Sequence, residues 1–332
     1  MADQSPKKLG LLDATLLVSG SMIGSGIFIV STLMLRDIGS PAWLLILWIL
    51  TGLITIFAAL SYGELAGMMP NAGGQYVYIQ RAYGKMASFL YGWTVFTVIQ
   101  TGVIAAVAVA FAKYTAVFFP ELNEVLFNTS FLTISWAQVL AIGSIVLLTY
   151  SNAQGVQNGK FIQFIFTFAK LFALGALIVL GLYIGLKTNV FSHNFSDAWK
   201  ATRTVIANDG AKIFQIPLTG WALVGALGAT IINSLFSADA WNNVTFIAGE
   251  IKDPKKNIPK SLFLGTLIVT VIYVLANLAY LALLPINGSL DGQNPVDQGM
   301  LFASNDRVGA SAAYVIFVRC PHLQISRKPQ KP

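Results

Sequence analysis

The chain has 332 residues, of which 55% are hydrophobic and only 11% are charged, and its formal net charge is +7. Soluble domains carry about 25% charged residues, so this composition excludes an ordinary soluble enzyme. The positive charge is scattered over loops and forms no basic face, so we expect no nucleic acid partner and attribute the charge to a bias of the cytoplasmic loops. The single cysteine, Cys320, excludes a disulfide framework, and both histidines lie outside the apolar segments, so we expect no metal and no cofactor.

Long apolar segments dominate the chain, and a membrane helix needs about 20 such residues. Seven segments meet this requirement: 13–35, 41–68, 86–118, 131–151, 159–185, 219–249 and 260–284. Turn-forming residues make 285–307 a loop, and the polar, aromatic stretch Gln75 to Tyr83 is placed at the membrane interface. The sequence therefore predicts an all-α, polytopic protein of the lipid bilayer.

The distribution of Lys and Arg predicts the orientation. With the amino terminus inside, the inner segments 1–12, 70–85, 152–160 and 250–260 contain nine Lys and Arg residues, against seven on the outer side. This small excess favours a cytoplasmic amino terminus in a plasma (inner) membrane. Three Asn-x-Ser/Thr triplets, at Asn128, Asn194 and Asn287, fall on the outer side, but this pattern is common by chance.

The first apolar segment contains the run Gly20-Ser-Met-Ile-Gly-Ser-Gly-Ile-Phe28. Glycine inside a helix costs about 1 kcal/mol relative to alanine, and backbone groups freed in hydrocarbon cannot turn to water. A small-residue packing face is the alternative for Gly20 and Gly24, but Ser25 and Gly26 extend the run beyond what packing needs. We therefore predict a helix that unwinds inside the membrane, as at the substrate sites of many secondary transporters.

The sixth apolar segment has a matching irregularity. Asp239 lies about twenty residues into it, and a carboxylate at that depth usually faces a cavity or a partner. Apolar residues resume at Val244, which favours a second half-helix over the alternative of a helix that simply ends near Leu235.

Lys170 lies near the middle of the fifth segment, at least about 16 Å from either end by helix rise. A lysine at the centre of a membrane helix costs about 2.5–3.5 kcal/mol on insertion scales. We expect its ammonium to point into the bundle and to contact carbonyl groups or a carboxylate; the alternative is a purely structural cation.

The end of the chain departs from this pattern. An apolar segment begins at Val308 and stops after about eleven residues at Arg319, which is too short to cross the membrane. We expect a chain cut short, or read out of frame, within an eighth helix; the alternative is a short re-entrant end. A chain of this length is not expected to transport by itself.

These motifs together resemble the amino acid–polyamine–organocation transporter superfamily, in its L-type amino acid transporter branch. The resemblance runs from about Leu9 to Tyr314 and rests on an ordered set of motifs: Gly24-Ser-Gly-Ile-Phe28, Ser61-Tyr-Gly-Glu-Leu65, Gly73-Gly74, Ala169-Lys-Leu171, Trp241-Asn242 and Glu250-Ile-Lys-Asp-Pro254.

The resemblance implies a LeuT-like five-plus-five inverted-repeat fold with discontinuous helices 1 and 6, here with an incomplete second repeat. The implied parts are an inner terminus 1–12, a first repeat 13–185, an outer loop 186–218, a partial second repeat 219–318 and a polar tail 319–332. In this family the unwound first helix, here Gly24, Ser25 and Gly26 with the following Ile27, donates amides to a substrate carboxylate.

The resemblance also implies where the substrate α-ammonium binds. Its acceptors are the carbonyls around Ile23 and those of the second break, which here comprises Phe236, Ser237, Ala238 and Asp239. Half-helix N-termini favour an anion and unwound carbonyls favour a cation, so a zwitterion suits this pair of sites. The family's fifth-helix lysine corresponds to Lys170 and takes the place of a sodium ion.

The implied function is sodium-independent permeation or exchange of small neutral L-amino acids by alternating access. A cationic amino acid or amine antiporter and a non-transporting membrane fragment are the alternatives. Eukaryotic members of this branch carry a cysteine between helices 3 and 4 that bonds a heavy chain, and residues 119–130 contain none. No disulfide-linked heavy chain is therefore expected, and an enzyme is the weakest interpretation because no apolar segment carries an acid–base pair or an activated nucleophile.

Overall fold

The computed structural model describes residues 9–70, 72–116, 118–128, 133–153, 156–206, 213–288, 295–302 and 308–319. The chain divides into two compact units, one formed by residues 1–72 with 166–332 and the other by residues 73–165. The predicted tail 319–332 lies outside the described residues beyond Arg319.

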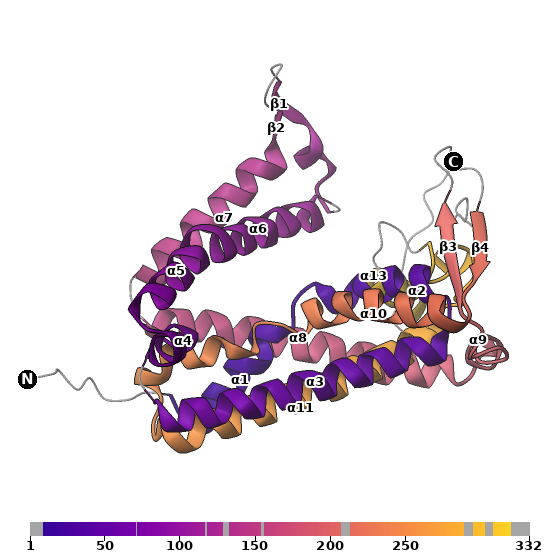
Figure 1. Ribbon diagram of the computed structural model, residues 1–332. Helices are drawn as coiled ribbons and strands as arrows, with labels where there is room; N and C mark the ends of the chain where they lie inside the picture. The colour runs from indigo at the N-terminus through magenta and orange to yellow at the C-terminus, as the bar shows by residue number, and fades with distance from the viewer. Residues whose placement is uncertain are drawn as a thin grey trace, which may run out of the picture. The chain divides into compact units, whose positions relative to one another are not determined.

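The first unit contains both interrupted helices and most of the long helices (Figure 1). Its elements are α1 (Leu11–Met22), η1 (Gly26–Phe28), α2 (Val30–Ile38), α3 (Pro41–Met68), the larger part of α8 (Val156–Gly185), α9 (Val190–Asn194), β3 (Thr202–Ile206), β4 (Ile213–Pro217), α10 (Gly220–Ser237), η4 (Trp241–Glu250), α11 (Pro254–Leu283), α12 (Pro295–Gln298) and α13 (Val308–Arg319).

Helix α11 is the centre of this unit. It lies alongside α3 over most of its length and also packs on α1 (Figure 1). Glycines allow these close approaches: a Cβ on Gly52 of α3 would collide with Thr270, and a Cβ on Gly265 would lie 2.5 Å from Val18 of α1. Small residues at such contacts let membrane helices pack closely, so these glycines bring α1 and α3 onto α11.

The corner between α2 and α3 follows from local sequence. Gly39 ends α2 with φ 55°, a left-handed conformation that favours glycine. Ser40 then caps α3 by accepting a hydrogen bond from the Trp43 amide, and Pro41 occupies the first turn, where a missing N–H costs nothing.

The second unit is a helical hairpin with a short β-hairpin at its tip. Its elements are α4 (Gln75–Tyr83), α5 (Lys85–Thr94), the π-helical segment η2 (Val95–Gln100), α6 (Thr101–Thr115), η3 (Pro120–Asn123), β1 (Val125–Asn128), β2 (Thr133–Ser135), α7 (Trp136–Ala153) and the beginning of α8. Small buried residues, Ala108 and Ala112 of α6 and Ala141 of α7, form its core.

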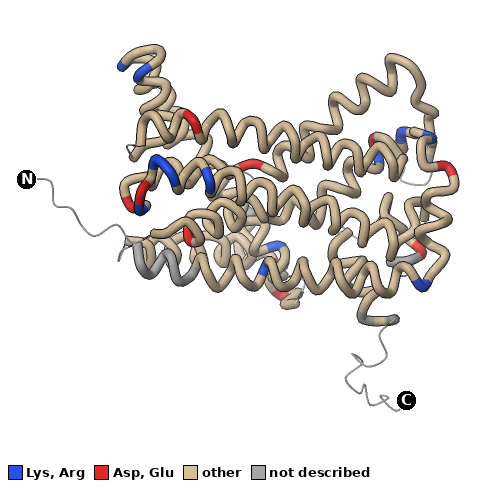
Figure 2. Tube along the Cα trace, turned by 90° about the horizontal axis from the view of Figure 1, so that it is seen from below, with Lys and Arg blue, Asp and Glu red and all other residues tan. Residues whose placement is uncertain are grey.

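Within the part of the chain that the structure describes, six helices are long and apolar enough to cross a membrane, and the predicted first span consists of the shorter helices α1 and α2. The fold is therefore that of a mostly helical, multi-pass membrane protein. Figure 2 shows that most Lys, Arg, Asp and Glu residues lie near the ends of the long helices and that their middle parts are nearly uncharged, as a bilayer requires.

Several boundaries differ from the sequence prediction. The loop 186–218 contains α9 and the antiparallel hairpin β3–β4, in which Thr204 pairs with Gln215. The loop 285–307 contains α12, and the seventh span begins at Pro254 rather than 260, with Pro259 inside the helix. Short strands and proline-containing first turns give no apolar signal, which is why hydropathy alone missed them.

Candidate functional site

The first helix is interrupted where the sequence predicted. Helix α1 ends at Met22, Ile23 is extended (φ −74°, ψ 92°), and helical structure resumes only as the short 3-10 turn at Gly26. Ile23 and Ile27 are buried, whereas Gly24 and Ser25 are exposed. Among the described residues, the amides of Ser25, Gly26 and Ile27 have no hydrogen-bond acceptor.

The sixth helix is interrupted in the same manner. Helix α10 ends at Ser237, Ala240 is left-handed with φ 69°, and the chain resumes in η4. The predicted second half-helix is therefore present, but it is a 3-10 rather than an α-helix. The carbonyls of Ala238 and Asp239 have no hydrogen-bond donor among the residues that the structure describes. The side chains of Phe236 and Asp239 are exposed here, whereas Ser237 and Ala238 are buried.

The two interruptions contact each other. A Cβ built on Gly26 would lie 2.9 Å from Cβ and 3.2 Å from Cα of Ser237. Only glycine lets the two backbone segments approach each other this closely. Unpaired amides of the first break and unpaired carbonyls of the second therefore lie in neighbouring segments.

Tyr273 of α11 joins the ends of the two half-helices. Its hydroxyl donates to the Met22 carbonyl at 2.9 Å and lies 3.2 Å from the Ser237 carbonyl, so the single proton is shared between the last residues of α1 and α10. The ring also packs edge-to-face on Trp48 of α3, with centroids 5.3 Å apart. Sequence reasoning missed Tyr273; a hydroxyl midway along an apolar helix, one turn before Asn277, was the available signal.

Lys170 completes the set of side chains on the first break. Its Nζ donates to the Ile23 carbonyl at 3.0 Å and lies 3.5 Å from the Gly20 carbonyl. The predicted contact with carbonyl groups is confirmed. A cation at the C-terminal end of α1 neutralises carbonyls left without intrahelical partners and opposes the negative end of the helix dipole.

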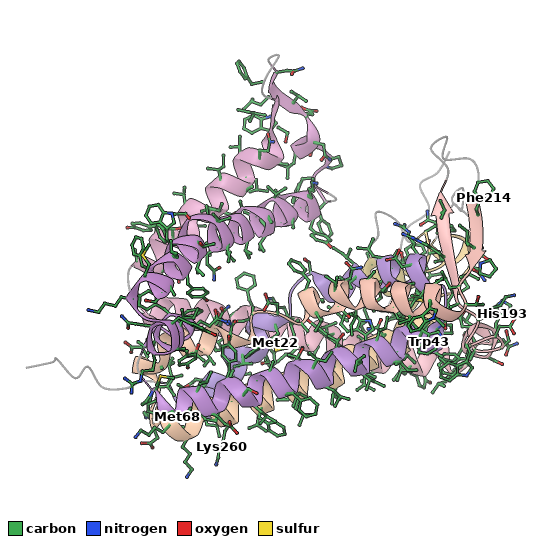
Figure 3. The ribbon with its side chains drawn as sticks, in the orientation of Figure 1. Met22, Trp43, Met68, His193, Phe214 and Lys260 are labelled. Carbon is green, nitrogen blue, oxygen red and sulfur yellow. The ribbon has the colours of Figure 1, made fainter. Side chains whose placement is uncertain are left out.

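The interruption lies midway along the bundle. Figure 3 shows Met22 between Met68 and Lys260 at one end of the first unit and Trp43 and His193 at the other. The Tyr273 bond to Met22 places both at the same depth. The broken segments therefore lie far from both helix ends, at a depth where non-helical backbone is tolerated only when it is buried in protein or lines a water-filled cavity.

The start of η4 is fixed on α3 by an aromatic pair. The rings of Tyr62 and Trp241 meet edge-to-face, with centroids 5.0 Å apart and an interplanar angle of 87°. Such pairs contribute about 0.5–1.5 kcal/mol beyond their burial. The residue just before Trp241, Ala240, is held in a conformation that L-residues rarely adopt.

Ala240→Gly is expected to stabilise the protein, because glycine removes a left-handed strain of about 1–2 kcal/mol. Glycine also raises the conformational entropy of the unfolded chain, which offsets about 0.5–1 kcal/mol of this gain. Thermal unfolding in detergent should shift upward by one to a few degrees, on the order expected for a change below about 1 kcal/mol. Ala238→Gly is the matched control: Ala238 has φ −99°, so this change should lower the unfolding temperature. An equal shift for both variants would contradict the strain at Ala240.

Two interrupted helices that contact each other inside a helical bundle define a multi-pass membrane protein of the discontinuous-helix class. The chain belongs to the amino acid permease family, whose sequence model it matches over residues 9–320. It is 33% identical to the human (Homo sapiens) large neutral amino acids transporter small subunit 2 over 274 residues, which cover 82% of this chain and 47% of that protein.

A second relative is the b(0,+)-type amino acid transporter 1 of Mus musculus. The two proteins are 29% identical over 311 residues, which cover 93% of this chain and 57% of the relative. The chain thus spans about half the length of the curated relatives that it matches. Both relatives are named as transporters rather than enzymes.

Proposed function

We propose that this chain forms the substrate-binding part of a secondary transporter that moves small neutral L-amino acids by alternating access, without sodium. The observation that carries the proposal is the contact between Gly26 and Ser237, which places the unpaired amides of one break beside the unpaired carbonyls of the other. Membership of the amino acid permease family and the names of the relatives support the substrate class.

The proposed binding mode uses the backbone on both sides. The amides of Ser25, Gly26 and Ile27, at the start of η1, receive the α-carboxylate, because amides at a helix start favour an anion. The carbonyls of Ala238 and Asp239, with that of Phe236, receive the α-ammonium. The Ile23 carbonyl already accepts from Lys170, so it has one lone pair left for the substrate.

Three further features belong to the proposal. The repeat boundaries 13–185 and 219–318 follow from the family fold, and Lys170 takes the position of a sodium ion. The amino terminus faces the cytoplasm of a plasma membrane. Since residues 119–130 contain no cysteine, the transporter works without a disulfide-linked heavy chain.

A binding assay with matched ligands tests the zwitterion site. The intact 332-residue chain, purified into lipid nanodiscs, is exposed to L-alanine, to propanoate and to ethylamine, so that each single-charge ligand lacks one of the two groups. Saturable binding of L-alanine, and affinities at least tenfold weaker for the other two, would support the proposal. Equal affinity for propanoate, or no saturable binding of any neutral amino acid, would overturn it. Tighter binding of L-lysine than of L-alanine would instead indicate a cationic substrate.

A further inference from the structure

A buried side chain in the described part of the loop between α8 and α10, residues 186–206 and 213–219, bonds this loop to the end of α11. Asn194, at the end of α9, is only 7% exposed. Its Nδ2 donates to the Leu281 and Leu284 carbonyls at 2.8 and 2.9 Å, and its Oδ1 accepts the Ile286 amide at 3.0 Å. If the side-chain amide were turned over, its oxygen would face the two carbonyls and could not bond them. The hydrogen bonds therefore fix the orientation of the Asn194 amide.

These three bonds assign Asn194 a structural task. It caps the last carbonyls of α11, which have no intrahelical partners, and fixes the chain that follows. Although Asn194 begins an Asn-x-Ser triplet, its amide is buried and fully bonded, so it is no glycan acceptor in this conformation.

The hydrogen bonds continue from Asn194 to the outer half of the first broken helix. The Ile286 carbonyl accepts the Leu301 amide at 3.2 Å, and the Leu301 carbonyl accepts Nε of Arg36 at 2.8 Å. Arg36 lies in the last turn of α2. A continuous series of bonds, Asn194 to Ile286 to Leu301 to Arg36, therefore connects the loop 186–219 with α2.

The loop also contacts α2 directly: a Cβ on Gly39, the residue that ends α2, would collide with Oγ1 of Thr202 in β3 and lie 2.5 Å from the carbonyl oxygen of the same residue. Asp37 and Arg203 of β3 form an ion pair at 4.0 Å, and their side chains are 38% and 61% exposed. Exposed pairs of this kind contribute about 0–1 kcal/mol. Closer to α3 the loop is anchored firmly, because buried Ser40 donates to the Ala198 carbonyl at 2.5 Å. The loop is thus fixed to α2, α3 and α11.

We propose that Asn194 is a positioning residue that keeps α2 closed, packed on α10 and bonded to α11 through Ser31, by fixing the carbonyl to which Arg36 is bonded. This inference rests on the proposed function, since α2 continues the η1 segment that carries Gly26 and Ile27 of the proposed site. Opening, a movement of α2 out of this packing, exposes the site toward the membrane face that carries α9, and it requires the Arg36 bond to Leu301 to break.

Ser31 of α2 offers a reporter of this movement. It is fully buried and its hydroxyl donates to Oδ1 of Asn277 in α11 at 2.5 Å. A cysteine at this position is protected while α2 is closed and becomes accessible when α2 moves away. The background is Cys320→Ser with Ser31→Cys, because Cys320 is the chain's single cysteine.

The experiment measures the rate at which a membrane-impermeant maleimide labels Ser31→Cys in sealed vesicles. A separate Asn189→Cys variant, at an exposed position before α9, identifies the vesicles that present the α9 face. Asn194→Ala and Arg36→Met should each raise the labelling rate from that face about tenfold. This is the factor expected when the bond of the charged Arg36 side chain to the Leu301 carbonyl is lost. The matched control Asn189→Ala should leave the rate unchanged.

The double variant tests whether Asn194 acts through Arg36. Combining both changes should give a rate close to that of the faster single variant, because the two residues belong to one series of bonds. Multiplied effects, or an unchanged rate in Arg36→Met, would overturn the proposal. If Asn194→Ala does not fold, Asn194→Leu, which keeps the shape of the side chain but can neither donate nor accept, takes its place, and an unchanged rate in that variant is equally contradictory.

The labelling needs no amino acid, so it separates the two proposals. Accelerated labelling in a protein that binds no amino acid would contradict the proposed function and leave the role of Asn194 standing. Unchanged labelling in a protein that binds L-alanine would contradict the role of Asn194 alone.

Discussion

Gly26→Val is expected to abolish amino acid binding while the chain still inserts into the membrane. A Cβ on Gly26 would lie within 2.9 Å of Ser237 Cβ, and two further methyl groups would push η1 and α10 apart. Overpacking of this kind costs about 1–3 kcal/mol. The displacement should weaken L-alanine binding by about a hundredfold or more, which corresponds to about 2.7 kcal/mol.

The matched control for this change is Gly225→Val in α10. A Cβ on Gly225 meets nothing within 4 Å, so the same substitution there adds the same side chain without a clash. Binding isotherms of both variants in nanodiscs, with size-exclusion profiles as a check of folding, make the comparison. Wild-type affinity in a folded Gly26→Val protein would show that close approach of the two breaks is not needed for binding.

Both interruptions could be predicted from the sequence because their causes are local. Glycine and serine at positions 20–26 weaken a helix wherever they occur, and Asp239 with its neighbours cannot continue an apolar helix. Lys170 could be predicted to contact carbonyls for the same reason: a cation in hydrocarbon has few other partners. In each case the residue type alone restricts the structure.

Tyr273 and Asn194 could not be predicted in this way. A tyrosine in a membrane helix suits the interface, the core or a partner hydroxyl equally well, and only the fold shows that it faces Met22 and Ser237. The Asn194 triplet is a frequent pattern, and its hydrogen bonds to α11 join residues about ninety positions apart. Long-range contacts of single polar side chains leave no periodic signal in one sequence.

Lys170→Met is expected to lower amino acid affinity by about tenfold to a hundredfold and to destabilise α1 at its C-terminal end. Methionine has a similar length but cannot donate, so the carbonyls of Gly20 and Ile23 lose their donor. Hydrogen bonds from charged groups contribute about 1.5–3 kcal/mol, which is the basis of this range. Isothermal binding of L-alanine and thermal unfolding give the two readouts.

The position of the ammonium also predicts how salt acts on the unmutated chain. Because Lys170 already brings a positive charge to the carbonyls of the first break, binding of L-alanine should be equal in sodium chloride and in choline chloride. Lys187→Met is the control for a lost positive charge, since Lys187 lies beyond the end of α8 and bonds the exposed Tyr183. That variant should keep its affinity. A strict sodium requirement in the unmutated chain, or equal affinity losses in both lysine variants, would mean that the ammonium at Ile23 does not serve as the cation of this site.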